Sequence, residues 1–214
     1  MLSIQWQRFE LPDADVRLAQ FCDTRAAQRW FEQLHTEVPW ERHRLKLFGR
    51  EIDAPRLTCW IGDRDAVYTY SGTRFVPHAW TPACAQLRSR VNALCSERYN
   101  SVLCNLYRSG LDSMGWHSDN EPELGPRPTI ASLSFGASRR FRLRHRRDPT
   151  LRLELELPSG SLLLMAGATQ ENYRHDLPKA ARKVDARINL TFRAVGTGLR
   201  GRRAHPKPDI DGRD

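Results

Sequence analysis

The sequence of 214 residues contains no long apolar run. A membrane-spanning helix needs about 20 consecutive apolar residues, whereas the longest aliphatic run, Leu162-Leu163-Leu164-Met165, has the length of a buried strand. The first residues, Met1 to Arg8, also lack the charged start and apolar centre of a secretory signal peptide. We therefore expect a protein that works away from membranes in the cytoplasm, or in the nucleus if the cell is eukaryotic.

Regularly spaced cysteines are absent as well. The chain has five: Cys22, Cys59, Cys84, Cys95 and Cys104. They are odd in number and include no Cys-x-x-Cys pair, which argues against a zinc cluster and against a disulfide framework. Reduced, partly buried thiols fit better and are typical of a reducing compartment.

Acidic residues are the minority among the charged side chains. The 25 Asp and Glu residues face 34 Lys and Arg residues, so the formal net charge is +9. Such an excess favours a polyanionic partner or an anionic surface. Arginine-rich compositions also follow genomic base content, so the charge alone leaves nucleic-acid binding open.

Internal repeats and linkers that would divide the chain are missing too. The sequence is 40% hydrophobic and 28% charged, which is typical of a globular protein, and its length suffices for one sizeable core. We expect a monomer with a single domain over residues 1–195. A flexible basic tail is expected over residues 196–214, where apolar periodicity is lost.

Two helices are expected in the first half of the chain. Asp23 or Thr24 can cap a helix that runs to about His35, and a second helix follows Thr81-Pro82 with the proline in its first turn. Short strands are expected within 1–15, 55–63, 66–72, 101–107, 129–135, 140–144, 152–157, 161–165 and 187–193. This order predicts an α+β fold, in which a double-sheet jelly roll or barrel is braced by the two helices.

His117 and Asp119 stand one residue apart. In a strand, their side chains would point to the same face and would supply two of the three ligands of a 2-His-1-carboxylate iron site. His-x-Asp is common by chance, and a solvated polar turn after Gly110 and Gly115 is the alternative interpretation.

The segment from Arg187 to Arg193 has two chemically different faces. With a period of two, one face carries Arg187, Asn189, Thr191 and Arg193, and the other carries Ile188, Leu190 and Phe192. On an outer strand the polar face would meet water. If the apolar face packs on the helices instead, two arginines lie inside the sandwich and need anionic partners. A dicarboxylate, with one carboxylate bound bidentately by arginine, meets that need.

Three further residues fit such a site. Asn105 and Tyr107 share a strand face and offer an amide and a phenol as donors. His175 follows an expected strand and a loop, and it is the candidate third metal ligand. The other histidines have no comparable carboxylate partner, so we expect them to be structural.

In combination, these motifs resemble the AlkB family of Fe(II)- and 2-oxoglutarate-dependent dioxygenases, nearest to its double-stranded-DNA repair branch. The resemblance rests on His117-x-Asp119, His175 and Arg187-x5-Arg193, and it covers roughly residues 14 to 195. It implies a double-stranded β-helix, a form of jelly roll. It also implies that the catalytic iron is bound by His117, Asp119 and His175. Arg187 would pair with the distal carboxylate of 2-oxoglutarate, with Asn105, Tyr107, Asn189 and Arg193 around this cofactor.

The resemblance further implies a reaction and a substrate. With O₂ as cosubstrate, 2-oxoglutarate is decarboxylated to succinate while an N-methyl group is hydroxylated and lost as formaldehyde. The implied substrates are N1-methyladenine and N3-methylcytosine in DNA. These lesions cannot pair normally, so flipping them out of a duplex costs less than flipping an intact base.

A nucleotide-recognition segment is implied at about residues 40–75. Tyr68 and Tyr70 match positions that hold or flank the flipped base, although cross-strand aromatic packing is the alternative. Leu47-Phe48-Gly49 matches a hydrophobic finger that fills the gap left by that base, although a simple hairpin core is the alternative.

Two further features concern substrate contact. Glu121 matches an acidic residue beside the base pocket, where a carboxylate could accept an exocyclic amine. Asn120 stands where the family often has another acidic residue, so the base preference stays open. A basic hairpin suited to phosphate contact, or else a solvated basic edge, contains Arg139, Arg140, Arg142, Arg144, Arg146 and Arg147.

Other functions are open from the sequence. The same chemistry could act on RNA, or on a protein, a lipid or a small molecule, because related dioxygenases share the metal triad. The basic surface and the Leu47-Phe48-Gly49 finger argue against the last three. A jelly-roll binding module without enzymatic activity would leave Arg187 and Arg193 unexplained.

Overall fold

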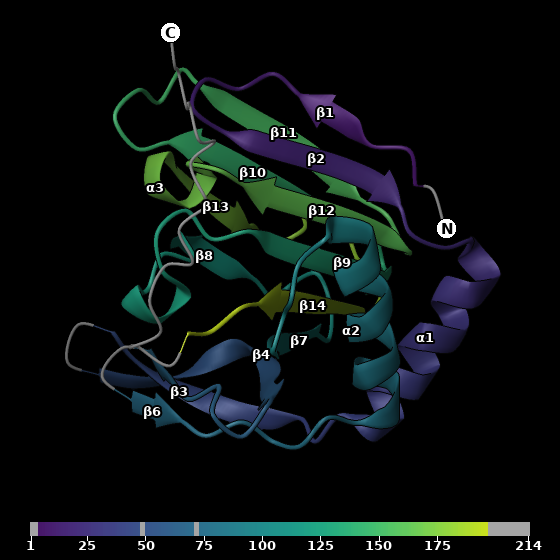
Figure 1. Ribbon diagram of the computed structural model, residues 1–214. Helices are drawn as coiled ribbons and strands as arrows, with labels where there is room; N and C mark the ends of the chain where they lie inside the picture. The colour runs from purple at the N-terminus through teal and green to yellow at the C-terminus, as the bar shows by residue number, and fades with distance from the viewer. Residues whose placement is uncertain (1–3, 48–49, 71–72, 197–214) are drawn as a thin grey trace, which may run out of the picture.

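The computed structural model describes residues 4–47, 50–70 and 73–196, and within these it leaves the side chains of residues 45–52 and 68–75 outside the described part. The centre of the fold is formed by two facing β-sheets (Figure 1). The larger sheet has eight strands in the order β1 (Gln7–Phe9), β2 (Asp15–Gln20), β12 (Ser161–Ala166), β9 (Ile130–Gly136), β14 (Arg187–Arg193), β7 (Ser101–Tyr107), β4 (Arg50–Gly62) and β3 (Glu41–Leu47).

The smaller sheet has four strands in the order β11 (Arg152–Leu157), β10 (Arg139–His145), β13 (Tyr173–Leu177) and β8 (Met114–His117). A separate two-stranded sheet pairs β5 (Tyr68–Tyr70) with β6 (Thr73–Phe75). All the strand pairings are antiparallel, as in a jelly roll. The predicted double-sheet fold is confirmed.

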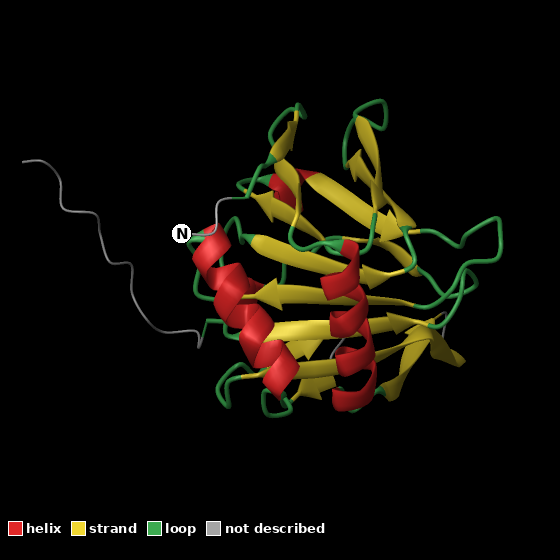
Figure 2. Ribbon diagram, turned by 90° about the vertical axis from the view of Figure 1, so that its right-hand side faces the viewer, coloured by secondary structure: helices red, strands yellow, loops and turns green. Residues whose placement is uncertain are grey.

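The two predicted helices cover the outer face of the larger sheet (Figure 2). Helix α1 (Thr24–Glu37) is capped by the Asp23 side chain, which accepts a hydrogen bond from the Ala26 amide at 2.7 Å. Helix α2 (Pro82–Cys95) is capped by Thr81 and begins with proline at its first position. Two short helical turns, η1 (Pro122–Leu124) and α3 (Thr169–Asn172), lie in loops beside the smaller sheet.

Two apolar clusters give the molecule its layers. One lies between the helices and the larger sheet, where Leu34 and Leu87 pack with Ile188, Leu190 and Phe192 of β14. The other fills the space between the sheets and contains Ile130, Leu163, Phe141, Leu143 and Leu157. Strand β14 therefore presents its apolar face to the helices and its polar face to the interior of the sandwich. The predicted orientation of this strand is confirmed.

Gly136 fixes where β14 begins. It ends β9 with φ +88° and is paired with Arg187, and a Cβ at this position would collide with the carbonyl oxygen of Ala186. The glycine thus permits the close approach that brings Arg187 to the end of the sandwich.

The strands differ from the expectation at four places. Strand β2 was not predicted, and the expected strand at 55–63 is the second part of the longer β4. Strand β8 ends at His117, so Asp119 lies in the loop that follows, not in a strand with His117. Strand β13, which contains His175, was not predicted. Within the described residues, no helix is long and apolar enough to cross a membrane.

Candidate metal and cofactor site

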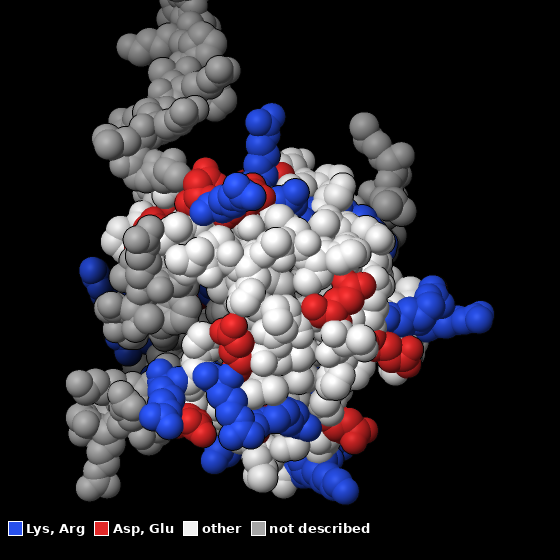
Figure 3. All heavy atoms as spheres, turned by 90° about the horizontal axis from the view of Figure 1, so that it is seen from below, with Lys and Arg blue, Asp and Glu red and all other residues white. Residues whose placement is uncertain are grey.

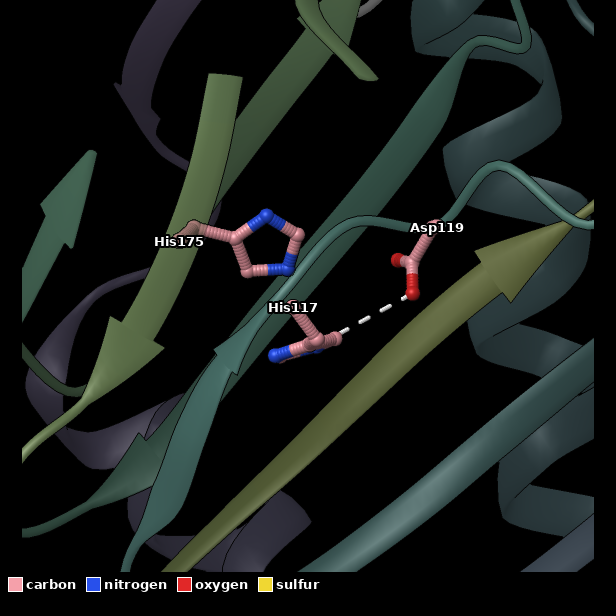
Figure 4. A group of neighbouring side chains, drawn as sticks. All are labelled: His117, Asp119 and His175. Carbon is pink, nitrogen blue, oxygen red and sulfur yellow. Dashed lines mark ion pairs between the residues drawn. The ribbon is translucent and has the colours of Figure 1, made fainter. Parts of the chain in front are cut away.

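His117 is held at the end of β8 with a defined tautomer. Its Nδ1 lies 2.8 Å from the carbonyl oxygen of Gly115, and because a carbonyl only accepts, Nδ1 carries the proton. Its Nε2 is left as the free nitrogen and lies 4.0 Å from Oδ1 of Asp119 (Figure 4). A backbone carbonyl that fixes one ring nitrogen is a common way to prepare the other as a metal ligand.

Asp119 is buried and held from two sides. Its backbone amide donates to Oε1 of Gln170 at 2.9 Å, and its Oδ1 accepts a hydrogen bond from Nη2 of Arg193 at 2.7 Å. Burial alone would raise the pKa of Asp119, but the positive charge of Arg193 outweighs it, and the pKa is lowered. The carboxyl group is therefore ionised, which is the state that binds a cation.

His175 faces His117 from the neighbouring strand. The two residues are direct partners in the pairing of β13 with β8, and their ring centroids are 4.2 Å apart. Burial lowers the pKa of His175 to about 3. Its imidazole is therefore neutral at physiological pH and has a lone pair available for a metal.

The three side chains form a site that fits a divalent iron ion. One ligand atom from each of His117, Asp119 and His175 lies within 4.8 Å of the other two. Figure 4 shows the carboxylate and both rings converging on one space. Two imidazole nitrogens and one carboxylate oxygen are the ligand set of non-haem Fe(II) oxygenases, which leaves positions on the metal for other ligands.

A cavity adjoins this triad between the two sheets, and its empty space of about 470 Å³ includes open solvent. All eight residues that the sequence predicted for metal and cofactor binding line it: Asn105, Tyr107, His117, Asp119, His175, Arg187, Asn189 and Arg193. The structure therefore brings residues from four separate strands and a loop to one place.

Arg187 is the main cation of the cavity. It is 2% exposed, and burial lowers its pKa to about 10. Its Nη2 donates to Ser134 Oγ at 2.8 Å, and its guanidinium lies 5.4 Å from the ring centroid of Tyr107. Its Nε is buried without a hydrogen-bond partner among the described residues. A buried guanidinium with an unused donor fits an anionic ligand.

The neighbouring polar residues form a hydrogen-bonded lining. Asn189 donates to Ser132 Oγ at 2.7 Å and to the Leu133 carbonyl at 2.9 Å. Asn105, its direct partner on β7, accepts a hydrogen bond from Arg56 at 2.9 Å. These contacts hold both amides at the cavity wall.

Sequence reasoning missed Arg56 and Gln170. Arg56 is 7% exposed and holds Asn105 from β4. Arg56, Thr58 and Trp60 lie on one face of β4. The polar residues Arg56 and Thr58 alternate with apolar residues as those on the polar face of β14 do, and this pattern could have pointed to Arg56. Gln170 lies on the short helix α3, where the sequence has no pattern that points to Asp119.

The residues predicted to contact the base are described to different extents. Phe48 and Gly49 lie outside the described residues, as do the side chains of Leu47, Tyr68 and Tyr70. Glu121 precedes η1 and is half-buried. Its Oε2 is buried and has no hydrogen-bond partner in the part of the chain that the structure describes.

Comparison with known proteins places this geometry in a family. The model of the 2OG-Fe(II) oxygenase superfamily matches residues 15–193. Human alpha-ketoglutarate-dependent dioxygenase alkB homolog 3 is 40% identical over 190 residues, which cover 85% of this chain and 66% of that protein. Human DNA oxidative demethylase ALKBH2 is 34% identical over 200 residues, which cover 89% of this chain and 77% of that protein.

Among solved structures, that of OsALKBH1 covers 88% of this chain and 99% of its own, with a TM-score of 0.60 and 15% identity, and so supports the fold. The chain spans 66% of the length of the alkB homolog 3 relatives that it matches. Its match to ALKBH2 extends over most of both chains, and the superfamily match over residues 15–193 contains the whole triad and the arginine-lined cavity. The chain therefore belongs to the 2OG-Fe(II) oxygenase superfamily, within its AlkB family, and its cofactors are Fe(II) and 2-oxoglutarate.

Proposed function

We propose that this protein is a dioxygenase that removes N-methyl groups from N1-methyladenine and N3-methylcytosine in DNA, as a direct reversal of alkylation damage. The observation that carries the proposal is one cavity that holds both the His117–Asp119–His175 triad and the buried Arg187. The relative named DNA oxidative demethylase, at 34% identity, supports the choice of DNA. We expect the enzyme to act as a monomer in the cytoplasm, or in the nucleus of a eukaryote.

The reaction divides between the cofactors and the chain. When bound with 2-oxoglutarate and O₂, Fe(II) supplies the oxidation that turns the N-methyl group into a hydroxymethyl group, which leaves as formaldehyde, while succinate and CO₂ form. His117, Asp119 and His175 would hold the metal. Arg193 keeps the Asp119 carboxylate ionised and oriented through its 2.7 Å hydrogen bond.

The polar residues of the cavity would bind and orient 2-oxoglutarate. Arg187 would take the distal carboxylate with the unused Nε and a neighbouring amino group, in the bidentate geometry that guanidinium favours. Asn105, Tyr107 and Asn189 would surround the rest of the molecule. The apolar part of the lining, which includes Leu103, Met114 and Phe141, would exclude water around it.

Base recognition would come from the segment at about residues 40–75 and from Glu121. Tyr68 and Tyr70 would stack on or flank the flipped base, at about 1–3 kcal/mol per stacked base. The buried Oε2 of Glu121, without a hydrogen-bond partner among the described residues, supports a role as acceptor for an exocyclic amine. A negative charge there would also favour a cationic lesion over an intact base.

The first test is turnover. Purified protein with Fe(II), 2-oxoglutarate, ascorbate and an N1-methyladenine oligonucleotide is expected to release formaldehyde in step with succinate. The same assay with N3-methylcytosine, and with both lesions in RNA, gives the preference among nucleic acids. Decarboxylation of 2-oxoglutarate without turnover of any methylated DNA or RNA would shift the assignment to a protein or small-molecule substrate.

The Leu47-Phe48-Gly49 finger makes a separate prediction. If Phe48 fills the gap left by a flipped base, Phe48→Ala should reduce demethylation of a duplex by about tenfold. The reason is that stacking of the aromatic ring on the bases beside the gap contributes about 1–3 kcal/mol. Activity on the single strand of the same sequence should stay within about twofold, because no neighbouring stack has to be restored. Equal losses on both substrates, or no loss on either, would show that Phe48 is not a duplex wedge.

A further inference from the structure

The outer face of the four-stranded sheet carries a row of paired charges. In the strand register, Arg142 of β10 is the direct partner of Glu154 on β11 and of Asp176 on β13. Its Nε donates to Asp176 at 2.8 Å, and the nearby Arg140 forms an ion pair with Glu154 at 3.6 Å. Opposite charges across neighbouring strands stabilise a sheet, so this part of the face is balanced.

The next row on the same face consists of arginines. Arg144 of β10 is the direct partner of Arg152 on β11 and of Arg174 on β13. All three side chains are exposed, and within the described residues none of them forms an ion pair with a carboxylate. We call these three residues the arginine row.

Such a row is unfavourable without a counter-charge. Like charges placed directly opposite on neighbouring strands destabilise a sheet, and here the arrangement occurs twice in succession. Because neighbouring strands lie about 4.8 Å apart, the row spans roughly 10 Å. A row of this length fits an extended anion better than a single small one.

The row is also fixed in place close to the metal site. The Arg144 guanidinium lies over the Trp116 ring at 4.6 Å, and Trp116 directly precedes the ligand His117. Arg146 donates to Ser118 Oγ at 2.8 Å, between the ligands His117 and Asp119. Burial lowers the pKa of Arg146, and the nearby positive charge of Arg174 lowers it further.

The structure also separates the row from the rest of the basic hairpin predicted from the sequence. Arg139 is 2% exposed and donates to the carbonyl oxygens of Asp112 and Pro178, at 2.9 and 2.7 Å, so it cannot reach a phosphate. Arg140 and Arg142 are engaged by carboxylates. The net charge of +9 alone does not locate an anion-binding surface, because Lys and Arg are interspersed with Asp and Glu on the face in Figure 3.

We propose that Arg144, Arg152 and Arg174 bind the sugar–phosphate backbone of the DNA strand that carries the alkylated base. Guanidinium groups bind phosphate oxygens bidentately, and an extended strand supplies several phosphates in succession. The substrate strand is the occupant that the site favours, because Arg174 directly precedes the ligand His175 on β13 and Arg144 lies over Trp116, which directly precedes the ligand His117. This inference rests on the proposed function, which supplies the nucleic acid.

The test compares two double variants of the full chain. Arg144→Gln/Arg174→Gln removes two charges from the row, whereas Arg25→Gln/Arg29→Gln removes two exposed arginines of α1, on the helix-covered side (Figure 2). Binding of an unmodified, fluorescein-labelled DNA, as a single strand and as a duplex, is followed by anisotropy at several salt concentrations. The row variant should bind at least about tenfold more weakly at low salt. For single-stranded DNA, its plot of log binding constant against log salt concentration should have a slope shallower by about 1.4, because two phosphate contacts are lost at about 0.7 each.

The other outcomes separate this inference from the proposed function. Unchanged binding by the row variant, or an equal loss in the α1 variant, overturns the inference. A loss confined to duplex DNA also overturns it, because the row would then contact the complementary strand. If the unaltered protein binds DNA through the row but releases no formaldehyde from methylated DNA, the proposed function fails and the row stands. A thermal shift with 2-oxoglutarate confirms that each variant is folded.

Discussion

Asp119→Ala is expected to abolish iron-dependent turnover, with activity reduced by at least about a thousandfold. Its carboxylate is the anionic ligand of the triad, and two neutral imidazoles alone hold Fe(II) poorly. The substitution also removes the partner of Arg193, whose Nη2 donates to Asp119 at 2.7 Å and whose side chain is buried. Breaking a buried ion pair costs about 3–5 kcal/mol, so the metal-free variant should also unfold at a lower temperature.

Asp119→Asn separates the two effects. The amide oxygen can still accept a hydrogen bond from Arg193, so this variant should keep more of the stability, but it lacks the negative charge that the metal needs. Metal affinity is measured with Co(II) by absorption spectroscopy, and the free energy of unfolding by denaturant titration without metal. A fully active Asp119→Ala variant would refute the metal site, and Co(II) binding at unaltered affinity would do the same.

The last strand shows why part of the fold and site could be predicted from the sequence. A period of two sorts Arg187, Asn189 and Arg193 from Ile188 and Phe192 without any knowledge of the neighbouring strands. Each set then has one environment in which it is stable: the apolar set against the helices, and the polar set around an anion. The predicted orientation of β14 is confirmed because both faces of the strand are buried, so each face needs an environment of matching polarity.

The rest depended on contacts between distant segments. The motif His117-Ser118-Asp119 was predicted within one strand, but β8 ends at His117. Asp119 is placed by the side chain of Gln170 and by Arg193, both far away in sequence. Likewise, the arginine row exists through the register of β10 with β11 and β13, and no pattern within one strand reveals it. Local periodicity therefore sufficed to sort the two faces of β14, whereas the surroundings of the predicted site residues needed the structure.

Arg187→Met is expected to weaken 2-oxoglutarate binding by at least about thirtyfold without destabilising the cofactor-free protein. The guanidinium is 2% exposed, burial lowers its pKa to about 10, and the charge of Arg139 acts in the same direction. Without an anion, this buried charge is costly, and replacement by an apolar side chain of similar length is often neutral or stabilising. With 2-oxoglutarate, the loss of a buried charge pair costs at least about 2 kcal/mol, which is about a thirtyfold loss of affinity.

The measurement is a pair of melting curves, with and without 2-oxoglutarate in the presence of Co(II). The variant should melt at or above the temperature of the unaltered protein when the cofactor is absent, and it should lose the rise in Tm that the cofactor causes. Arg187→Lys is the matched control, because it keeps the charge but not the two parallel donors. Its affinity for 2-oxoglutarate should fall between that of the unaltered protein and that of Arg187→Met. Co(II) binding should persist in both variants, since Arg187 is not a metal ligand. A cofactor-free Arg187→Met protein that is several kcal/mol less stable would mean that the guanidinium serves the fold, and normal 2-oxoglutarate affinity would remove it from the cofactor site.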